Sequence, residues 1–172
     1  MRPARIARWL IVTLLVLMAL VAAALFGLAS CRPAEYRPFS LSAEQQEQVV
    51  GALEEHILKE FGNQAGAGKP FEWSITAIQA NAYLASMDAI ASRWGGPPRP
   101  TAEMEKAGFT APAVAMHDGR LTLMVQSNRH NKVLSLDLGF EFDPQGDLTV
   151  RTLAMRVGAL PVPQSMLEDK VA

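Results

Sequence analysis

The chain has 172 residues and a formal net charge of −1, and 49% of its residues are hydrophobic. Residues 32–172 carry 13 Lys and Arg (16 less Arg2, Arg5 and Arg8) against 17 Asp and Glu, a net charge of −4. They contain no basic cluster, which excludes the electrostatic footprint of a nucleic-acid-binding protein. The single cysteine, Cys31, excludes a disulfide and a thiolate metal site in the domain that follows it.

The first predicted element is a membrane-spanning helix over residues 9–29, a stretch of twenty-one residues without a charged side chain. At about 1.5 Å per residue this helix is roughly 30 Å long, the thickness of the hydrocarbon core of a bilayer. Three arginines precede the stretch, whereas only Arg32 and Arg37 follow it closely. Because positive residues favour the cytoplasmic side, we expect the N-terminus in the cytoplasm, residues 1–31 as the anchor and the rest of the chain outside.

Residues 28–31, Leu-Ala-Ser-Cys, offer a second interpretation, because they resemble the lipobox of bacterial lipoproteins, in which the chain is cleaved before a cysteine that is then lipidated. Cys31 is the candidate lipidation site. The apolar stretch is longer than the roughly 7–15 residues of a secretory signal and long enough to span the bilayer uncleaved. We therefore expect an uncleaved anchor, with a lipoprotein as the first alternative and a freely secreted form as the second.

Residues 32–40 contain two prolines and no periodicity, which predicts an extended stalk between the membrane and a single domain over residues 41–172. Ser42 and Gln45 form a capping box at the start of the first predicted helix of this domain. Its apolar residues recur at spacings of three and four: Val50, Leu53, Ile57 and Phe61. The helix is expected to end before a flexible link over residues 62–70.

Residues 71–75 alternate between apolar and polar side chains and predict a short strand. Thr76 and Gln79 then form a second capping box, which opens a helix expected to run to about Trp94. On a helical wheel its apolar residues share one broad face that a neighbouring element must cover. These residues are Ala80, Tyr83, Leu84, Met87, Ile90, Ala91 and Trp94.

Two polar residues, Asn81 and Asp88, lie seven positions apart on the margin of this apolar face. They either bond to a neighbouring loop or line a site. One Asn and one Asp with no base beside them define no chemistry, so we expect a structural polar border at these positions.

Beyond the proline-rich residues 95–100 a helical turn is expected over residues 101–106, and from Phe109 the hydrophobic period changes to two. Residues 117–120, His-Asp-Gly-Arg, predict a tight hairpin, and residues 127–131 predict a polar turn. The strand after that turn places Leu134, Leu136, Leu138, Phe140 and Phe142 on one face and Ser135, Asp137 and Glu141 on the other.

The last predicted strand, residues 148–157, changes its apolar phase near residues 151–152, which predicts a β-bulge or burial on both faces. Residues 158–163 contain two prolines and are expected to end the sheet at an edge. The sequence therefore predicts an α+β fold after the transmembrane helix. In this fold, two main helices pack on the apolar face of an antiparallel meander of about four strands.

Candidate catalytic residues are scarce. His56, His117 and His130 have no HExxH or histidine-rich spacing, and no Gly-x-Ser-x-Gly elbow is present. Asp137 and Glu141 are four residues apart on one strand face, about 13 Å, which is too far for a coupled carboxylate pair. We therefore expect no catalytic residue, no metal site, no cofactor and no enzymatic activity.

Four methionines, Met87, Met116, Met124 and Met155, suggest an apolar groove between helix and sheet, because methionine adapts to irregular apolar ligands. The alternative is that these side chains fill the core. The sequence leaves both interpretations open, with core filling as the expectation.

Several segments taken together resemble uncharacterised single-pass envelope proteins of planctomycetes and verrucomicrobia. They are the arginine-flanked anchor, Arg32-Pro33, residues 75–84 (ITAIQANAYL), the hairpin at residues 118–120 and residues 157–163 (VGALPVP). The Asn-x-aromatic-Leu helix and the Gly-x-Leu-Pro-x-Pro exit are also similar to the YpmS family. A more remote similarity to tubular lipid-binding folds, with a helix against a curved antiparallel sheet, implies a lipid groove. No activity is implied by these resemblances.

The expected protein is a non-enzymatic bacterial envelope protein, held by residues 9–29 in the cytoplasmic (inner) membrane with its domain on the outer side. We expect it to bind a partner protein or an apolar ligand and not to bind nucleic acid. The alternative is a lipid-handling module with a groove between helix and sheet, and a hydrolase comes third.

Overall fold

The computed structural model describes residues 3–57, 62–67, 74–96, 99–143 and 147–163. Its helices are α1 (Pro3–Ser30), α2 (Ala43–Glu54), α3 (Gly62–Gly66), α4 (Ala77–Ala85), α5 (Met87–Trp94) and α6 (Pro100–Lys106). Its strands are β1 (Phe109–His117), β2 (Arg120–Ser127), β3 (Lys132–Phe142), β4 (Leu148–Val157) and β5 (Leu160–Pro161). The described part of the chain therefore confirms an α+β fold.

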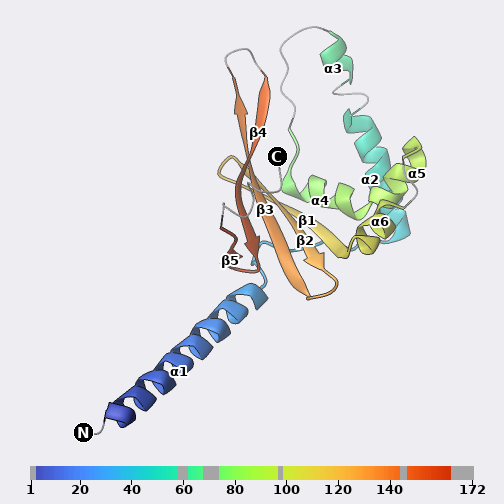
Figure 1. The fold of residues 1–172 in the computed structure, drawn as a ribbon. Helices are drawn as coiled ribbons and strands as arrows, with labels where there is room; N and C mark the ends of the chain where they lie inside the picture. Colours follow the sequence, from blue (N-terminus) through green and yellow to red (C-terminus); the bar gives the residue numbers. More distant parts are fainter. Residues whose placement is uncertain (1–2, 58–61, 68–73, 97–98, 144–146, 164–172) are drawn as a thin grey trace.

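The helix α1 extends away from the rest of the molecule (Figure 1). Its segment Val12–Ser30 has a mean hydropathy of 2.7 and is not buried against other parts of the chain. This helix is long and apolar enough to cross a membrane, as the sequence predicts.

Both predicted capping boxes are present. The hydroxyl groups of Ser42 and Thr76 accept hydrogen bonds from the backbone N–H of Gln45 and Gln79, respectively. Each glutamine side chain in turn accepts a hydrogen bond from the backbone N–H of its N-cap residue. These local bonds satisfy N–H groups that a helix terminus leaves free. The starts of α2 and α4 therefore follow from the sequence alone.

The single helix expected up to Trp94 is divided into α4 and α5 at Ser86, whose backbone leaves the helical region (φ −107°, ψ 11°). Both helices contact α2, but α4 also lies against β1 whereas α5 also packs on α6. Trp94, expected on the buried face, is 45% exposed.

Other local expectations also change. The first helix keeps its α form only to Glu54 and continues through residues 55–57 as a wider π-helical turn. The helix α3 occupies part of the link expected to be flexible. Of the strand expected over residues 71–75, residues 71–73 lie outside the described residues, and residues 74–75 are not in a strand. The sequence also allows an amphipathic helical turn over residues 164–170, and these residues lie outside the described ones.

The strands form one antiparallel meander in the order β1-β2-β3-β4-β5. The predicted hairpin turns at Asp118 and Gly119, both with positive φ, as a tight turn between antiparallel strands requires. The predicted bulge is confirmed close to its expected place, because the pairing skips Leu153 between Ala154 and Thr152. A fifth strand, of two residues, pairs with the end of β4 and forms the edge at which the sequence predicts that the sheet ends.

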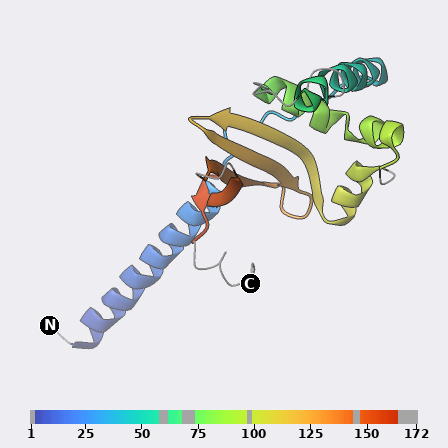
Figure 2. The ribbon, with the colours of Figure 1, turned by 90° about the horizontal axis from the view of Figure 1, so that it is seen from above.

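The position of the helices differs from the expectation. They were predicted to cover the apolar face of the sheet, but α4 and α6 lie against β1, at one edge of the sheet, and α2 packs on α4 and α5 (Figures 1 and 2). The helices thus form a layer beside the first strand, and α1 leaves the sheet on the other side.

A side-chain amide joins the helices to the sheet. Asn81 accepts a hydrogen bond from the backbone N–H of Val114 at 2.8 Å and donates to the Val114 carbonyl at 2.7 Å. It also donates to the Ala77 carbonyl at 2.7 Å, and its side chain is buried. The amide of Asn81 therefore takes the place of a neighbouring strand at the edge of β1.

Replacing Asn81 with alanine should lower the free energy of unfolding by about 2–4 kcal/mol, because it leaves the buried N–H and C=O of Val114 without partners. Urea unfolding of the full-length protein in detergent, followed by tryptophan fluorescence, measures the change. Gln48→Ala, an exposed amide on α2, is the matched control and should change stability by less than about 0.5 kcal/mol. Equal effects of the two substitutions would contradict the role of Asn81.

Candidate functional site

The sheet has two faces with opposite character. We call one the strap face, because the segment that follows α1 crosses it; apart from Met124 and Val133, its side chains are small or polar. They are Ala113, Ala115, Thr122, Met124, Val133, Ser135 and Asp137, all buried. We call the other the leucine face. On β1 this face begins with Val114, which is buried beside the helices, and Met116. It continues with Leu121, Leu123, Val125, Leu134, Leu136, Leu138, Phe140, Met155 and Val157, and on the β3–β4 hairpin with Phe142, Leu148 and Val150.

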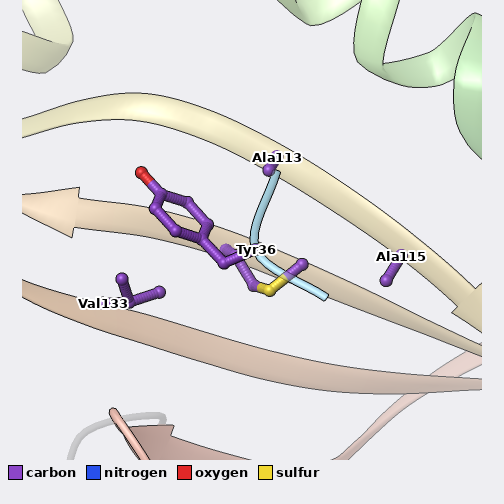
Figure 3. Close-up of a cluster of buried hydrophobic side chains, with 5 residues drawn as sticks. Tyr36, Ala113, Ala115 and Val133 are labelled. Atoms are coloured by element: carbon purple, nitrogen blue, oxygen red, sulfur yellow. The ribbon is translucent and has the colours of Figure 1, made fainter. Parts of the chain in front are cut away.

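The strap is held by Tyr36, whose side chain is only 7% exposed and whose hydroxyl donates to the Ala111 carbonyl at 2.8 Å. Figure 3 shows its ring among Ala113, Ala115 and Val133 over the strands. Burial raises the pKa of Tyr36, while the nearby Arg32 guanidinium acts in the opposite direction. Residues 32–40, expected to form a stalk, therefore contribute a core side chain.

Burial on the sheet is the reverse of the expectation. Met124, on the strap face, is 1% exposed, whereas Leu123 and Phe140, on the leucine face, are 38% and 42% exposed. The small side chains of Ala113 and Ala115 allow the strap to approach the strands closely, which explains why this face becomes the covered one. In the described parts of the chain, the leucine face is left largely open.

The strap face contains one buried polar cluster. Asp137 accepts hydrogen bonds from the Thr122 hydroxyl and from the Arg156 guanidinium, both at 2.8 Å. The hydroxyl of Ser135 and Nε of Arg156, in residues directly opposite each other on β3 and β4, are buried without a partner among the described residues. The cluster has no histidine, and its carboxylate is already bonded to a cation, so we assign it a structural role.

The leucine face has a hollow at each end. The base hollow, of about 800 Å³, lies between the α6–β1 turn and the β2–β3 turn, and its floor includes Leu134 and Val157. The distal hollow, of about 490 Å³, lies by the β1–β2 turn and is lined by Ile75, Met116, Leu121 and Phe140 among others. Both volumes fall in the range of small-molecule sites.

The end of α1 is docked on the sheet beside the base hollow. The Ala159 N–H donates to the Leu28 carbonyl at 2.9 Å, and the Lys132 ammonium donates to the Ser30 hydroxyl. Gly158 has a φ of +60°, and a Cβ at this position would lie 2.6 Å from the Ala29 carbonyl oxygen. The anchor and the sheet are thus joined directly.

The methionines predicted to line one groove are separated. Met124 belongs to the buried cluster of the strap face, whereas Met116 and Met155 lie half-buried on the leucine face. Met87 lies half-buried in α5. Only the pair on the leucine face could therefore contribute to a common apolar surface.

The expected polar border serves structure at both positions. Asn81 bonds to the edge of β1, as described above, and Asp88 accepts hydrogen bonds from the backbone N–H and the hydroxyl of Thr101, at 2.9 and 2.5 Å. Asp88 thereby caps the first turn of α6, whose own N-cap residue, Arg99, makes no side-chain cap. Both residues bond to neighbouring segments, which is the first of the two alternatives given by the sequence.

The remaining candidate residues are dispersed. Cys31 is exposed and follows α1 directly. His56 contacts the Ser74 carbonyl at 3.2 Å, and His117 and His130 are exposed at the ends of strands or in turns. Within the described ranges, no group of three or more His, Cys, Asp or Glu is placed to hold a metal ion.

Sequence reasoning did not identify the contacts of three residues that organise this region: Tyr36, Lys132 and Gly158. An aromatic residue in an otherwise polar, proline-containing segment is a weak signal of docking, and a glycine between strands is a signal of a turn. Neither signal names the contacting element. No protein-family model matches the chain, and no match is found among curated proteins or solved structures.

Gly158→Ala should destabilise the full-length protein in detergent more than Gly119→Ala. Both glycines have a positive φ, +60° and +72°, so both substitutions introduce backbone strain of about 1–3 kcal/mol. Only at Gly158 does the new methyl group also meet the backbone of α1, whereas the space at Gly119 is open. Urea unfolding measures the difference, and equal losses would show that the close contact with α1 contributes nothing.

Proposed function

We propose that the protein is a membrane-anchored, non-enzymatic binding protein whose leucine face takes up an apolar ligand or the apolar surface of a partner protein. The observation that carries this proposal is the open leucine face itself. A solvent-exposed face of an antiparallel sheet is normally polar. Here the buried face is the more polar one, and the exposed face presents adjoining leucines such as Leu123 and aromatic residues such as Phe140. Contiguous exposed apolar surface of this kind is typical of interaction sites.

The anchor is best explained as an uncleaved helix. Cleavage before Cys31 would remove Leu28 and Ser30, and with them the hydrogen bonds to Ala159 and Lys132 that join α1 to the sheet. These contacts support the uncleaved anchor over the lipoprotein. The arginines before α1 support an N-terminus in the cytoplasm and a domain on the outer side of the cytoplasmic membrane of a bacterium.

A lipid-handling module is the second candidate, and the base hollow favours it. This hollow opens on the leucine face at the end nearest to the anchor. A hydrolase has little support, because the described residues bring no histidine to the buried Asp137 cluster.

Photo-cross-linking in intact cells tests the leucine face. A photoreactive amino acid at Leu123 or Phe140 should give an adduct with a lipid or with one distinct protein, because both positions are exposed on this face. The same amino acid at Glu141 on β3 or at Arg151 on the adjacent β4 is the control, since both residues point to the opposite face. Adducts of equal yield at all four positions, or none at Leu123 and Phe140, would refute the proposal.

The uncleaved anchor predicts that Cys31→Ser leaves the mass of the protein and its membrane attachment unchanged. Intact-mass spectrometry of the membrane fraction makes the comparison. A lipid-sized decrease in mass, or accumulation of a larger precursor, would instead establish the lipoprotein.

A further inference from the structure

The base hollow combines an apolar floor with a basic rim. Leu134 and Val157 form part of its floor, and its rim carries Lys106, Arg129 and Lys132. Glu105 is the acidic residue among the lining residues. Lys106 is paired with Glu103, which leaves Arg129 and Lys132 against Glu105. The rim therefore has an excess of positive charge at Arg129 and Lys132, although residues 32–172 as a whole have a net charge of −4. An amphipathic ligand with an anionic group matches this arrangement.

The position of the hollow narrows the choice of ligand. Lys132 lines the hollow, donates to the Ser30 hydroxyl and lies 4.4 Å from the centre of the Phe26 ring. Ser30 is the last residue of the apolar span Val12–Ser30. When this span crosses a bilayer, Lys132 lies at the level of the lipid headgroups, where cations meet anionic lipid.

We propose that the base hollow binds an anionic phospholipid of the adjoining leaflet, with the headgroup phosphate at Arg129 and Lys132 and one acyl chain on Leu134 and Val157. This inference rests on the proposed function, because it names the ligand of the leucine face. Two observations favour a phospholipid over a protein partner. The basic residues of the hollow complement an anionic headgroup, and the direct contact between α1 and the sheet places them at headgroup level, where a protein partner does not require them.

The leucine face continues from the hollow as a path for the acyl chain. Leu134, Leu136, Leu138 and Phe140 follow one another on the same side of β3. At about 3.3 Å per residue this row is roughly 20 Å long. It is therefore longer than an acyl chain that spans one leaflet of the hydrocarbon core, about 15 Å. A chain leaving the bilayer at the hollow would find apolar contacts along its length.

Photoreactive lipids test the proposal in the full-length protein reconstituted in phosphatidylcholine vesicles. Phosphatidylglycerol and diacylglycerol carrying the same diazirine acyl chain are added in separate samples, and the adducts are mapped on the tryptic peptide of residues 133–151. Phosphatidylglycerol should label this peptide more than diacylglycerol does. Labelling of the peptides that carry α1 gives the internal standard, because any bilayer lipid can reach them.

Arg129→Gln should reduce the phosphatidylglycerol labelling of residues 133–151 about fivefold, the equivalent of about 1 kcal/mol for one cation at a membrane surface. The substitution does not touch the contacts of α1, and it leaves in place the tryptic cleavage sites after Lys132 and Arg151 that release residues 133–151. Arg120→Gln, which removes the same charge at the distal hollow, is the control and should have no effect. An excess of inorganic phosphate should not displace the lipid.

The outcomes separate this inference from the proposed function. Equal labelling of residues 133–151 by both lipids, unchanged by Arg129→Gln, would overturn the headgroup site and leave an apolar leucine face. Displacement by inorganic phosphate would overturn it in favour of a free anion. Absence of labelling with either lipid would overturn it as well, and a protein adduct at Phe140 in cells would then identify a protein as the occupant.

Discussion

The contact between the strap and the sheet decides the character of the whole domain. A sheet with small residues on one face and leucines on the other would ordinarily bury the leucines, because their burial is worth about 1.5–3 kcal/mol each. Here Tyr36 covers the small residues instead, and its hydroxyl bonds to the bulged part of β1 at Ala111. The strap follows α1 directly. Its contact with the small residues thus leaves the leucine face largely open.

The anchor also meets a physical requirement of its own at this junction. The last carbonyl groups of a helix have no partner within the helix. In α1 the Leu28 carbonyl accepts from Ala159, and the Lys132 ammonium interacts with both the Ser30 hydroxyl and the Phe26 ring. These contacts fix the orientation of the sheet relative to the helix. The open leucine face and its base hollow are therefore held close to the C-terminal end of the apolar helix α1.

Much of the fold could be predicted because its signals are local. The capping boxes at Ser42 and Thr76 and the Asp118-Gly119 turn each depend on a few consecutive residues, and the bulge follows from a change of phase within one strand. The break at Ser86 and the role of Asn81 depend on residues distant in sequence. A hydrophobic period of two likewise separates the two faces of a strand, but it does not indicate which face other elements cover. For this reason the sequence predicts a site at the methionines and not on the leucine face.

The edge of β1 has a consequence for the behaviour of the protein at high concentration. An edge strand with free N–H and C=O groups is a template for pairing with another chain, and an adjacent apolar face increases the tendency to form fibrils. In β1 the Ala111 carbonyl is bonded to Tyr36, residue 112 is a proline without an N–H, and both groups of Val114 are bonded to Asn81. The protein can therefore expose a leucine-rich surface while this edge resists aggregation.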